Sequence, residues 1–210
     1  MKRILIADDH AILRRGLKEI LVGEFDGAIF GEAGNAQEVL TEVQNQPWDL
    51  VILDITMPGR SGLDLLRDLK QLRPELPVLV LSMHPEDQYA KRVLRSGAAG
   101  YMNKETAPKE LVTAIRKVLD GGRYVSAALA EKLASDLSAQ AVRLPHERLS
   151  DREFEVLRMI ASGKTITQIA DELHLSATTV STHRARILDK MSMTNNAELM
   201  RYAMRNGLID

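Results

Sequence analysis

The stretch LVILDITMPGRSG, residues 50–62, joins an apolar run to a break in regular structure at Pro58 and Gly59. Such a run is typical of a strand that is buried on both faces, as in the centre of a parallel sheet. A carboxylate, Asp54, stands at its end, where an unpaired buried charge is unfavourable. Asp54 is therefore either a structural cap, the usual interpretation of a single aspartate after a strand, or a reactive group.

The surrounding residues 1–120 alternate between short β-rich runs and helix-like stretches. The predicted strands are residues 4–7, 28–33, 50–55, 78–82 and 99–104. The predicted helices are residues 12–22, 36–44, 62–72, 89–96 and 108–119. This alternation predicts an α/β domain with a five-stranded, doubly wound parallel sheet, whose ligand site lies beyond the carboxyl ends of the strands.

The composition excludes several classes of protein. The chain has no cysteine, so disulfides, thiol chemistry and cysteine-based zinc sites are excluded. The first apolar run is too short for a signal peptide, and no uninterrupted apolar stretch is long enough to span a membrane. We therefore expect a cytoplasmic protein with no membrane partner. A net charge of -1 gives no overall attraction to nucleic acid, so DNA binding would need a local patch.

Polar residues lie at the carboxyl ends of four of the predicted strands or directly after them: Asp8 and Asp9, Asp54, Ser82 and Lys104. The carboxyl ends of parallel strands share one edge of a sheet, so these side chains should meet there. Three converging carboxylates repel one another unless a cation joins them, and their hard oxygen ligands suit Mg²⁺. Taken singly, the aspartates could be caps and the lysine a solvated surface residue. Their conjunction instead favours a site where a carboxylate attacks a phosphoryl group.

The motifs IADDH, LDITMPGRSG, LSMH and GYMNK occur in this order, and residues 1–120 resemble the flavodoxin-like receiver domain of bacterial two-component response regulators. The resemblance implies that Asp54 is the phosphoacceptor and that Lys104 and Ser82 contact the phosphoryl group. It also implies a Mg²⁺ cofactor with a set of four ligands: Asp9 directly, Asp8 mostly through water, Asp54, and the backbone carbonyl of Thr56.

Three further residues near this edge have less certain roles. The resemblance implies that Tyr101 is a switch residue that turns inward when Ser82 moves, although Tyr101 could equally be a half-exposed strand aromatic. His84 is interpreted as a modifier of dephosphorylation at best, and His10 as a packing or capping residue at the start of a helix. The break at residues 57–59 is expected to shape a loop that leaves Asp54 accessible.

The rest of the chain divides into a linker, residues 121–148, and an all-helical region, residues 149–210. The linker contains a short amphipathic helix around residues 126–137. The helices expected after it are residues 151–161, 165–173, 177–191 and 196–206. Apolar residues at Ile166, Ile169 and Leu173 give the second of these helices a buried face, and a short turn leads to the third. Two helices so joined are typical of a helix-turn-helix.

The third helix has a polar face that suits the DNA major groove, although any helical bundle also has a polar outer face. The run from LSDREFEVL to ILDKM, with NGLI near the end, resembles the LuxR-type output domain of NarL/FixJ-type regulators. The resemblance implies that Glu153 is a structural residue and that residues 196–206 form the helix through which two DNA-binding domains pair. It also implies the following DNA contacts: Thr178, Thr179, Ser181, Thr182, Arg184, Arg186 and Lys190. Where Ser181 and Asn196 stand, many relatives have a basic residue, which implies weaker binding per monomer and makes dimerisation more necessary.

These features together predict a phosphorylation-activated, DNA-binding transcriptional regulator. The expected partners are a sensor histidine kinase, double-stranded DNA with a two-fold-symmetric site, a second copy of the chain on activation, and RNA polymerase. We expect no enzyme activity beyond Mg²⁺-dependent phosphorylation and dephosphorylation of the receiver itself. Two alternatives remain: a phosphate relay or protein-binding module, and a DNA-binding protein whose receiver no longer needs phosphate.

Overall fold

The computed structural model describes residues 1–57, 62–105, 107–138 and 144–209. These residues form two compact units, Met1–Ser138 and Ala139–Asp210. Two residues of the predicted break at residues 57–59, Pro58 and Gly59, lie outside the described residues. In the part of the chain that is described, no helix has the length and apolar character needed to cross a membrane.

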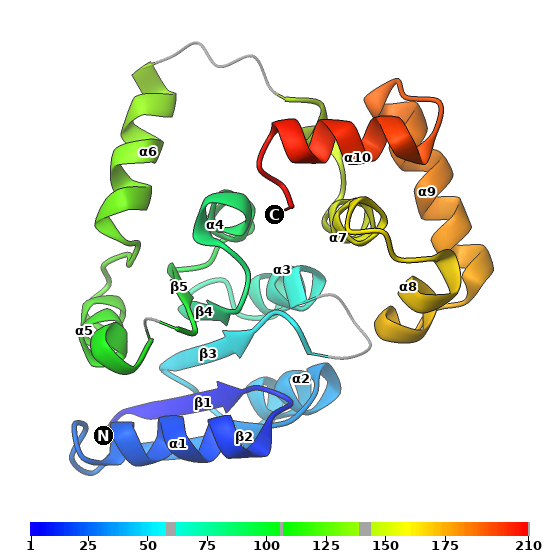
Figure 1. Ribbon diagram of the computed structural model, residues 1–210. Helices are drawn as coiled ribbons and strands as arrows, with labels where there is room; N and C mark the ends of the chain where they lie inside the picture. Colours follow the sequence, from blue (N-terminus) through cyan, green and yellow to red (C-terminus); the bar gives the residue numbers. More distant parts are fainter. Residues whose placement is uncertain (58–61, 106, 139–143, 210) are drawn as a thin grey trace. The chain divides into compact units, whose positions relative to one another are not determined.

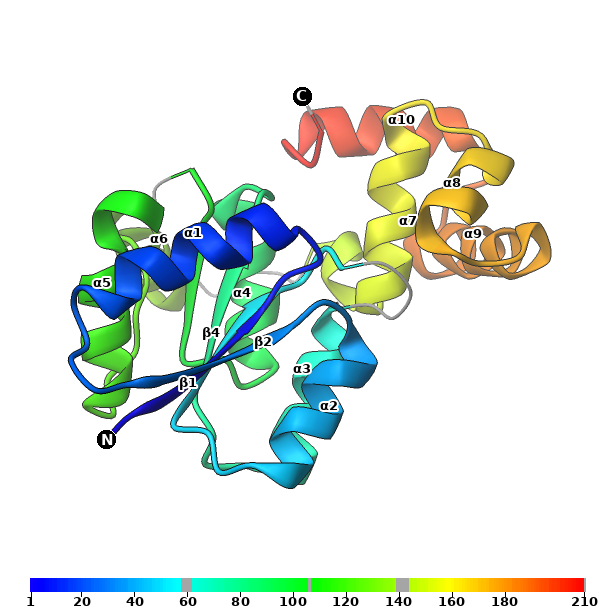
Figure 2. The same ribbon diagram turned by 90° about the horizontal axis from the view of Figure 1, so that it is seen from below.

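The first unit is a doubly wound parallel sheet with the strand order β2-β1-β3-β4-β5, which confirms the predicted fold class. Its strands are β1 (Arg3–Ala7), β2 (Ile29–Ala33), β3 (Leu50–Asp54), β4 (Val78–Ser82) and β5 (Gly100–Asn103). Its helices are α1 (Ala11–Val22), α2 (Ala36–Asn45), α3 (Gly62–Leu72), α4 (Glu86–Arg95), α5 (Ala107–Leu119) and α6 (Ala127–Ser138). Helices α1 and α5 cover one face of the sheet, and α2, α3 and α4 cover the other (Figure 1, Figure 2).

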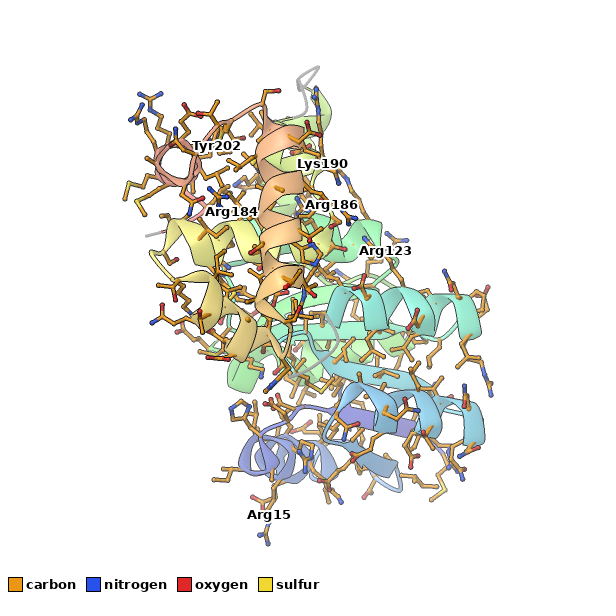
Figure 3. The ribbon with its side chains drawn as sticks, turned by 90° about the vertical axis from the view of Figure 1, so that its right-hand side faces the viewer. Arg15, Arg123, Arg184, Arg186, Lys190 and Tyr202 are labelled. Atoms are coloured by element: carbon orange, nitrogen blue, oxygen red, sulfur yellow. The ribbon has the colours of Figure 1, made fainter. Side chains whose placement is uncertain are left out.

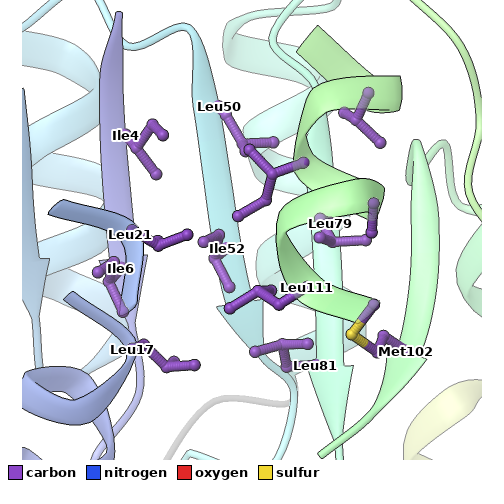
Figure 4. Close-up of a cluster of buried hydrophobic side chains, with 13 residues drawn as sticks. Ile4, Ile6, Leu17, Leu21, Leu50, Ile52, Leu79, Leu81, Met102 and Leu111 are labelled. Atoms are coloured by element: carbon purple, nitrogen blue, oxygen red, sulfur yellow. The ribbon is translucent and has the colours of Figure 1, made fainter. Parts of the chain in front are cut away.

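Alternate strand residues form the core beneath α1 and α5 (Figure 4). Successive side chains of a strand point to opposite faces, so every second apolar residue reaches this cluster. The cluster consists of Ile4, Ile6, Leu50, Ile52, Leu79, Leu81 and Met102 from the sheet, with Leu17, Leu21, Leu111, Ala114, Ile115 and Val118 from the two helices. The intervening strand residues are buried on the other face, which explains the continuous apolar runs in the sequence.

On the far side of the sheet, β2 approaches the single tryptophan of the chain. A Cβ atom at Gly31 would lie only 2.3 Å from the Trp48 ring, so glycine is required at this position. The indole Nε1 of Trp48 donates a hydrogen bond to the backbone carbonyl of Glu42 over 3.1 Å. The ring is thereby fixed between the edge strand and the end of α2.

The segment between α5 and α6 is tied to the edge of the sheet. The amide of Tyr101 donates to the carbonyl of Tyr124 over 3.1 Å, and Gly100 forms a parallel bridge with the same residue. Two residues later, the amide and hydroxyl of Ser126 both donate to the Glu86 carboxylate at the start of α4. The start of α6 is therefore anchored to both β5 and α4.

The second unit contains η1 (Pro145–Arg148), α7 (Asp151–Ala161), α8 (Ile166–Leu173), α9 (Ala177–Met191) and α10 (Asn196–Arg205). Capping boxes at Ser150 and Thr165 start α7 and α8, and Ser176 caps α9 by accepting from the Thr179 amide. Buried Phe154, Leu157, Ile169, Val180, Ile187 and Leu199 hold these helices together. The predicted helices agree with these bounds to within a residue, whereas the short η1 turn was not predicted.

Candidate functional site

A buried acidic pocket lies at the carboxyl ends of β1 and β3. Asp8 follows β1 and Asp54 ends β3, and each is only 1% exposed. Ser82, the last residue of β4, is fully buried. Because β1, β3 and β4 are adjacent in the sheet, residues far apart in the sequence meet at this edge. Burial of unpaired carboxylates is unfavourable, so partners must compensate their charge.

Lys104 supplies part of that compensation. Its Nζ donates to Oδ2 of Asp54 over 2.6 Å and to Oδ2 of Asp8 over 2.7 Å. The lysine side chain is 8% exposed, and those of the two aspartates are 2% exposed or less. Burial disfavours the ammonium, but the hydrogen bonds and charges of both carboxylates outweigh it and raise the pKa of Lys104. The lysine is therefore a positively charged bridge between two strand ends.

The second oxygen of Asp54 is also engaged. The backbone amide of Thr56 donates to Oδ1 over 2.8 Å, and the Thr56 hydroxyl donates to the same atom over 2.5 Å. Hydrogen bonds to a carboxylate stabilise its charged form. The Asp54 side chain is thus held in a single orientation, between Lys104 on one oxygen and Thr56 on the other.

Asp9 and His10 complete the pocket. The His10 Nδ1 lies 2.8 Å from Oδ1 of Asp9 and 3.3 Å from Oδ1 of Asp8, which also accepts the His10 amide at 2.8 Å. His10 occupies the N-cap position of α1, but its side chain makes no capping hydrogen bond, so the predicted capping role is wrong. Ligand atoms of Asp8, Asp9, His10 and Asp54 all lie within 4.8 Å of one another. Lys104 contacts only two of the three carboxylates, Asp8 and Asp54, so this set of acidic side chains favours a further cation.

A chain of contacts leads from Ser82 to Tyr101. The Ser82 hydroxyl oxygen accepts the amide of His84 over 3.1 Å, and the carbonyl of His84 accepts the Tyr101 hydroxyl over 2.7 Å. The His84 ring stacks on that of Tyr89 in α4, with centroids 4.3 Å apart. Tyr101 is fully buried, so its interpretation as a half-exposed strand aromatic is wrong.

Helices α8 and α9 form a helix-turn-helix. α8 ends at Leu173, and its C-cap residue His174 has a left-handed backbone (φ 52°) that turns the chain toward α9. The face of α9 that packs inward carries Val180, Ile187 and Met191. Its outward face consists of exposed Thr178, Ser181, Thr182, Ala185 and Arg186, while Thr179 is half-buried and takes part in the cap with Ser176. Small polar side chains on this face permit close approach to a groove.

The basic residues of α9 differ in their partners. Lys190 donates to both carboxylate oxygens of buried Glu153, at 2.7 and 3.0 Å, and so joins the end of α9 to the start of α7. Arg184 donates from Nε to Oδ1 of Asn196 over 2.6 Å. Arg184 and Arg186 lie on opposite sides of α9 (Figure 3). Sequence analysis missed both pairings, because each joins helices that only tertiary packing brings together.

Comparisons with known proteins match a known family to each of the two units. A family model described as the response regulator receiver domain matches residues 4–116, and one described as bacterial regulatory proteins, luxR family, matches residues 147–203. Response regulator GacA of Pseudomonas aeruginosa is 36% identical, covering 100% of this chain and 99% of that protein. Response regulator UvrY of Escherichia coli K12 is 32% identical, covering 99% and 96%. RcsB of Salmonella enterica serovar Typhimurium, bound to promoter rprA with the phosphomimetic BeF3-, superposes with a TM-score of 0.66 at 27% identity, covering 96% and 98%.

Proposed function

The chain belongs to the two-component response regulators that combine a receiver domain with a LuxR-type output domain, and from this premise we propose that phosphorylation of Asp54 controls its binding to DNA. The observation that carries the proposal is the Lys104 bridge between Asp8 and Asp54, in the same chain as a helix-turn-helix. We assign residues 1–120 to the receiver, 121–148 to the linker and 149–210 to the DNA-binding domain. The protein is a regulator and not a conventional enzyme.

The acidic pocket fits a magnesium ion. Asp8, Asp9 and Asp54 offer hard carboxylate oxygens close together, and the carbonyl of Thr56 would add a neutral oxygen. When bound, Mg²⁺ would offset the negative charge that gathers around the transferred phosphoryl group. Asp9 would bind it directly and Asp8 mostly through water. The excess of carboxylates over the single ammonium supports this assignment.

In the proposed reaction, a carboxylate oxygen of Asp54 attacks the phosphorus of a phosphohistidine on a partner kinase. A P–O bond forms as the P–N bond breaks, and the imidazole leaves with the electron pair and a proton from solvent. Lys104 would transfer one hydrogen bond from Asp54 to a phosphoryl oxygen, keeping its bond to Asp8. The hydroxyl group of Ser82 would donate a hydrogen bond to another phosphoryl oxygen.

The contacts from Ser82 to Tyr101 offer a route by which this event alters the surface. A shift of Ser82 toward the phosphoryl group would pull on the amide of His84, whose carbonyl accepts the Tyr101 hydroxyl. Tyr101 would then stabilise one of two arrangements of β5 and α4. A phosphoryl group can drive such a change only if it binds one arrangement better than the other.

A kinase partner must dock beside the acidic pocket to transfer its phosphoryl group. Two large apolar side chains adjoin the pocket in the sequence and are exposed: Ile12 at 90% and Met83 at 58%. Exposed apolar residues beside a reactive group are typical of a protein-docking surface. We therefore assign this surface to the domain that carries the phosphohistidine. We also place this chain in the cytoplasm, where chromosomal DNA lies.

The outward face of α9 is proposed to enter the major groove. Thr178, Ser181 and Thr182 would lie against base edges, and Arg186 against a phosphate. RcsB dimers bind DNA, which supports a second copy of this chain on a two-fold-symmetric site. RNA polymerase is a further partner that this role implies.

The test is capture of genomic DNA fragments by the purified chain, with and without beryllofluoride and Mg²⁺, beside an Asp54→Ala variant. We expect enrichment of a two-fold-symmetric sequence in the activated wild type alone. Equal enrichment in every arm would show that the receiver does not control DNA binding. No enrichment in any arm would reject DNA binding and favour the relay alternative.

A further inference from the structure

Two arginines border the outward face of α9, and their surroundings differ. Residues two apart in a helix lie about 200° around its axis, which places Arg184 and Arg186 on opposite flanks, as Figure 3 shows. Arg186 is exposed and makes no hydrogen bond with the rest of the described chain. Arg184 is half-buried, and its Nε donates to Oδ1 of Asn196 over 2.6 Å.

Asn196 is itself fixed in place. It is the first residue of α10, directly after the N-cap Asn195, whose Oδ1 accepts the amide of Glu198 over 3.0 Å. The Glu198 carboxylate in turn accepts the Thr194 amide over 2.7 Å. Two hydrogen bonds of Glu198, one through its amide and one through its carboxylate, thus close the turn before α10, and Asn196 presents its side-chain oxygen from the first residue of that helix.

The hydrogen bond from Nε leaves the two terminal nitrogens of the Arg184 guanidinium available. A guanidinium is planar, so fixing Nε also fixes the direction of both terminal nitrogens. Among the described residues, these two nitrogens have no hydrogen-bond partner. Asn196 is neutral, so it orients the guanidinium without offsetting its charge. Lys190 on the same helix differs, because the carboxylate of Glu153 binds its ammonium and neutralises it.

We propose that Asn196 is a positioning residue for DNA binding, which holds Arg184 so that its terminal nitrogens meet a backbone phosphate on the α10 flank of the groove. Arg186 reaches the phosphates of the other flank without such support. This inference rests on the proposed function, since it requires α9 to lie in a DNA groove. A fixed arginine loses less side-chain freedom on binding than a mobile one, so the hydrogen bond strengthens binding through a residue that carries no charge.

The test measures affinity and its salt dependence. The full chain, with beryllofluoride and Mg²⁺, is titrated into two fluorescein-labelled DNA duplexes of about 30 base pairs whose sequences are unrelated to each other. Fluorescence anisotropy reports binding at a series of NaCl concentrations. Arg184→Ala should reduce the slope of log K against log[salt] by about one on both duplexes, as expected for one lost phosphate contact. Asn196→Ala should leave that slope unchanged and weaken binding by roughly three- to tenfold.

Double variants separate positioning from folding. In an Arg184→Ala background, Asn196→Ala should cause no further loss, whereas in an Arg186→Ala background its full effect should persist. Arg184→Lys keeps the charge and lacks the Nε donor, so it should keep the salt slope and become insensitive to Asn196→Ala.

Several outcomes would overturn the proposal. One is that Asn196→Ala binds DNA as tightly as the wild type. Another is that Asn196→Ala weakens binding equally in the Arg184→Ala background and also lowers the melting temperature, since Asn196 would then act only through α10. A loss for Arg184→Ala on one duplex alone would indicate a base contact instead. If the wild-type chain bound neither duplex, the proposed function itself would fail together with this inference.

Discussion

Replacement of Lys104 by methionine should destabilise the receiver strongly in the absence of Mg²⁺. The change keeps the length of the side chain and removes the ammonium that bridges Asp8 and Asp54. Both carboxylates are almost fully buried, and removing one partner of a buried ion pair costs about 3–5 kcal/mol. The pocket would then hold three carboxylates without a cation. We expect the receiver to lose stability of that order.

Hydrogen exchange of β1 and β3 amides measures this loss in the full chain. These central strands exchange only through global opening of the receiver, so a loss of about 3–5 kcal/mol accelerates their exchange by roughly two to nearly four orders of magnitude. Mg²⁺ should slow exchange more in Lys104→Met than in the wild type, because the variant lacks the ammonium that competes for the same oxygens.

A matched control is Lys117→Met, since Lys117 is exposed on α5 and should leave exchange unchanged. Adding Asp54→Asn to Lys104→Met should restore part of the stability, because one unpaired carboxylate is removed. Exchange in Lys104→Met within about threefold of wild type, or an equal Mg²⁺ effect in both proteins, would refute the electrostatic account of the pocket.

Three other expectations concern separate parts of the chain. Burial opposes ionisation of Glu153, but hydrogen bonds from Lys190 and the capping serine lower its pKa. The stability that ionised Glu153 contributes should therefore be present above pH 4.5, its pKa in the unfolded chain, and be lost as the pH falls through the lower pKa of the folded state. Urea titrations at several pH values should show that Glu153→Gln removes this pH dependence. Gly62→Ala places a Cβ 2.3 Å from the backbone beyond β3 and should cost about 1–3 kcal/mol or more in thermal unfolding, whereas Gly16→Ala has free space and should not destabilise. Ile12→Asp should block phosphotransfer from the partner kinase and leave activation by beryllofluoride intact; loss of both would contradict a docking role.

The parallel sheet was predictable because its signals are local. Continuous apolar runs mark central strands, and once their order is known the carboxyl ends must converge. The proximity of Asp8, Asp54 and Lys104 follows from that rule, although the residues are up to 96 positions apart. What the sequence could not supply was the detail of each contact, such as the pair of donors from Thr56 that orients Asp54.

Side-chain contacts between elements that are far apart in the sequence, and that no hydrophobic periodicity links, were not predictable. The pairing of Glu86 with Ser126 spans 40 positions and that of Glu153 with Lys190 spans 37. Each joins charged or polar residues on separate helices or loops, and no local sequence pattern identifies the partner. Helix α4 also begins three residues before its predicted start: Pro85 occupies the N-cap position, and its carbonyl accepts the amides of Gln88 and Tyr89.

The position of Trp48 gives the molecule a built-in optical reporter. The chain has one tryptophan, and its ring is fixed against Gly31 in the first unit. The second unit has only tyrosine among the strong ultraviolet chromophores, at Tyr202. Emission excited at the red edge of the absorption band therefore comes from the receiver alone. Comparing it with a signal from the whole backbone would show whether the two units unfold together or one after the other.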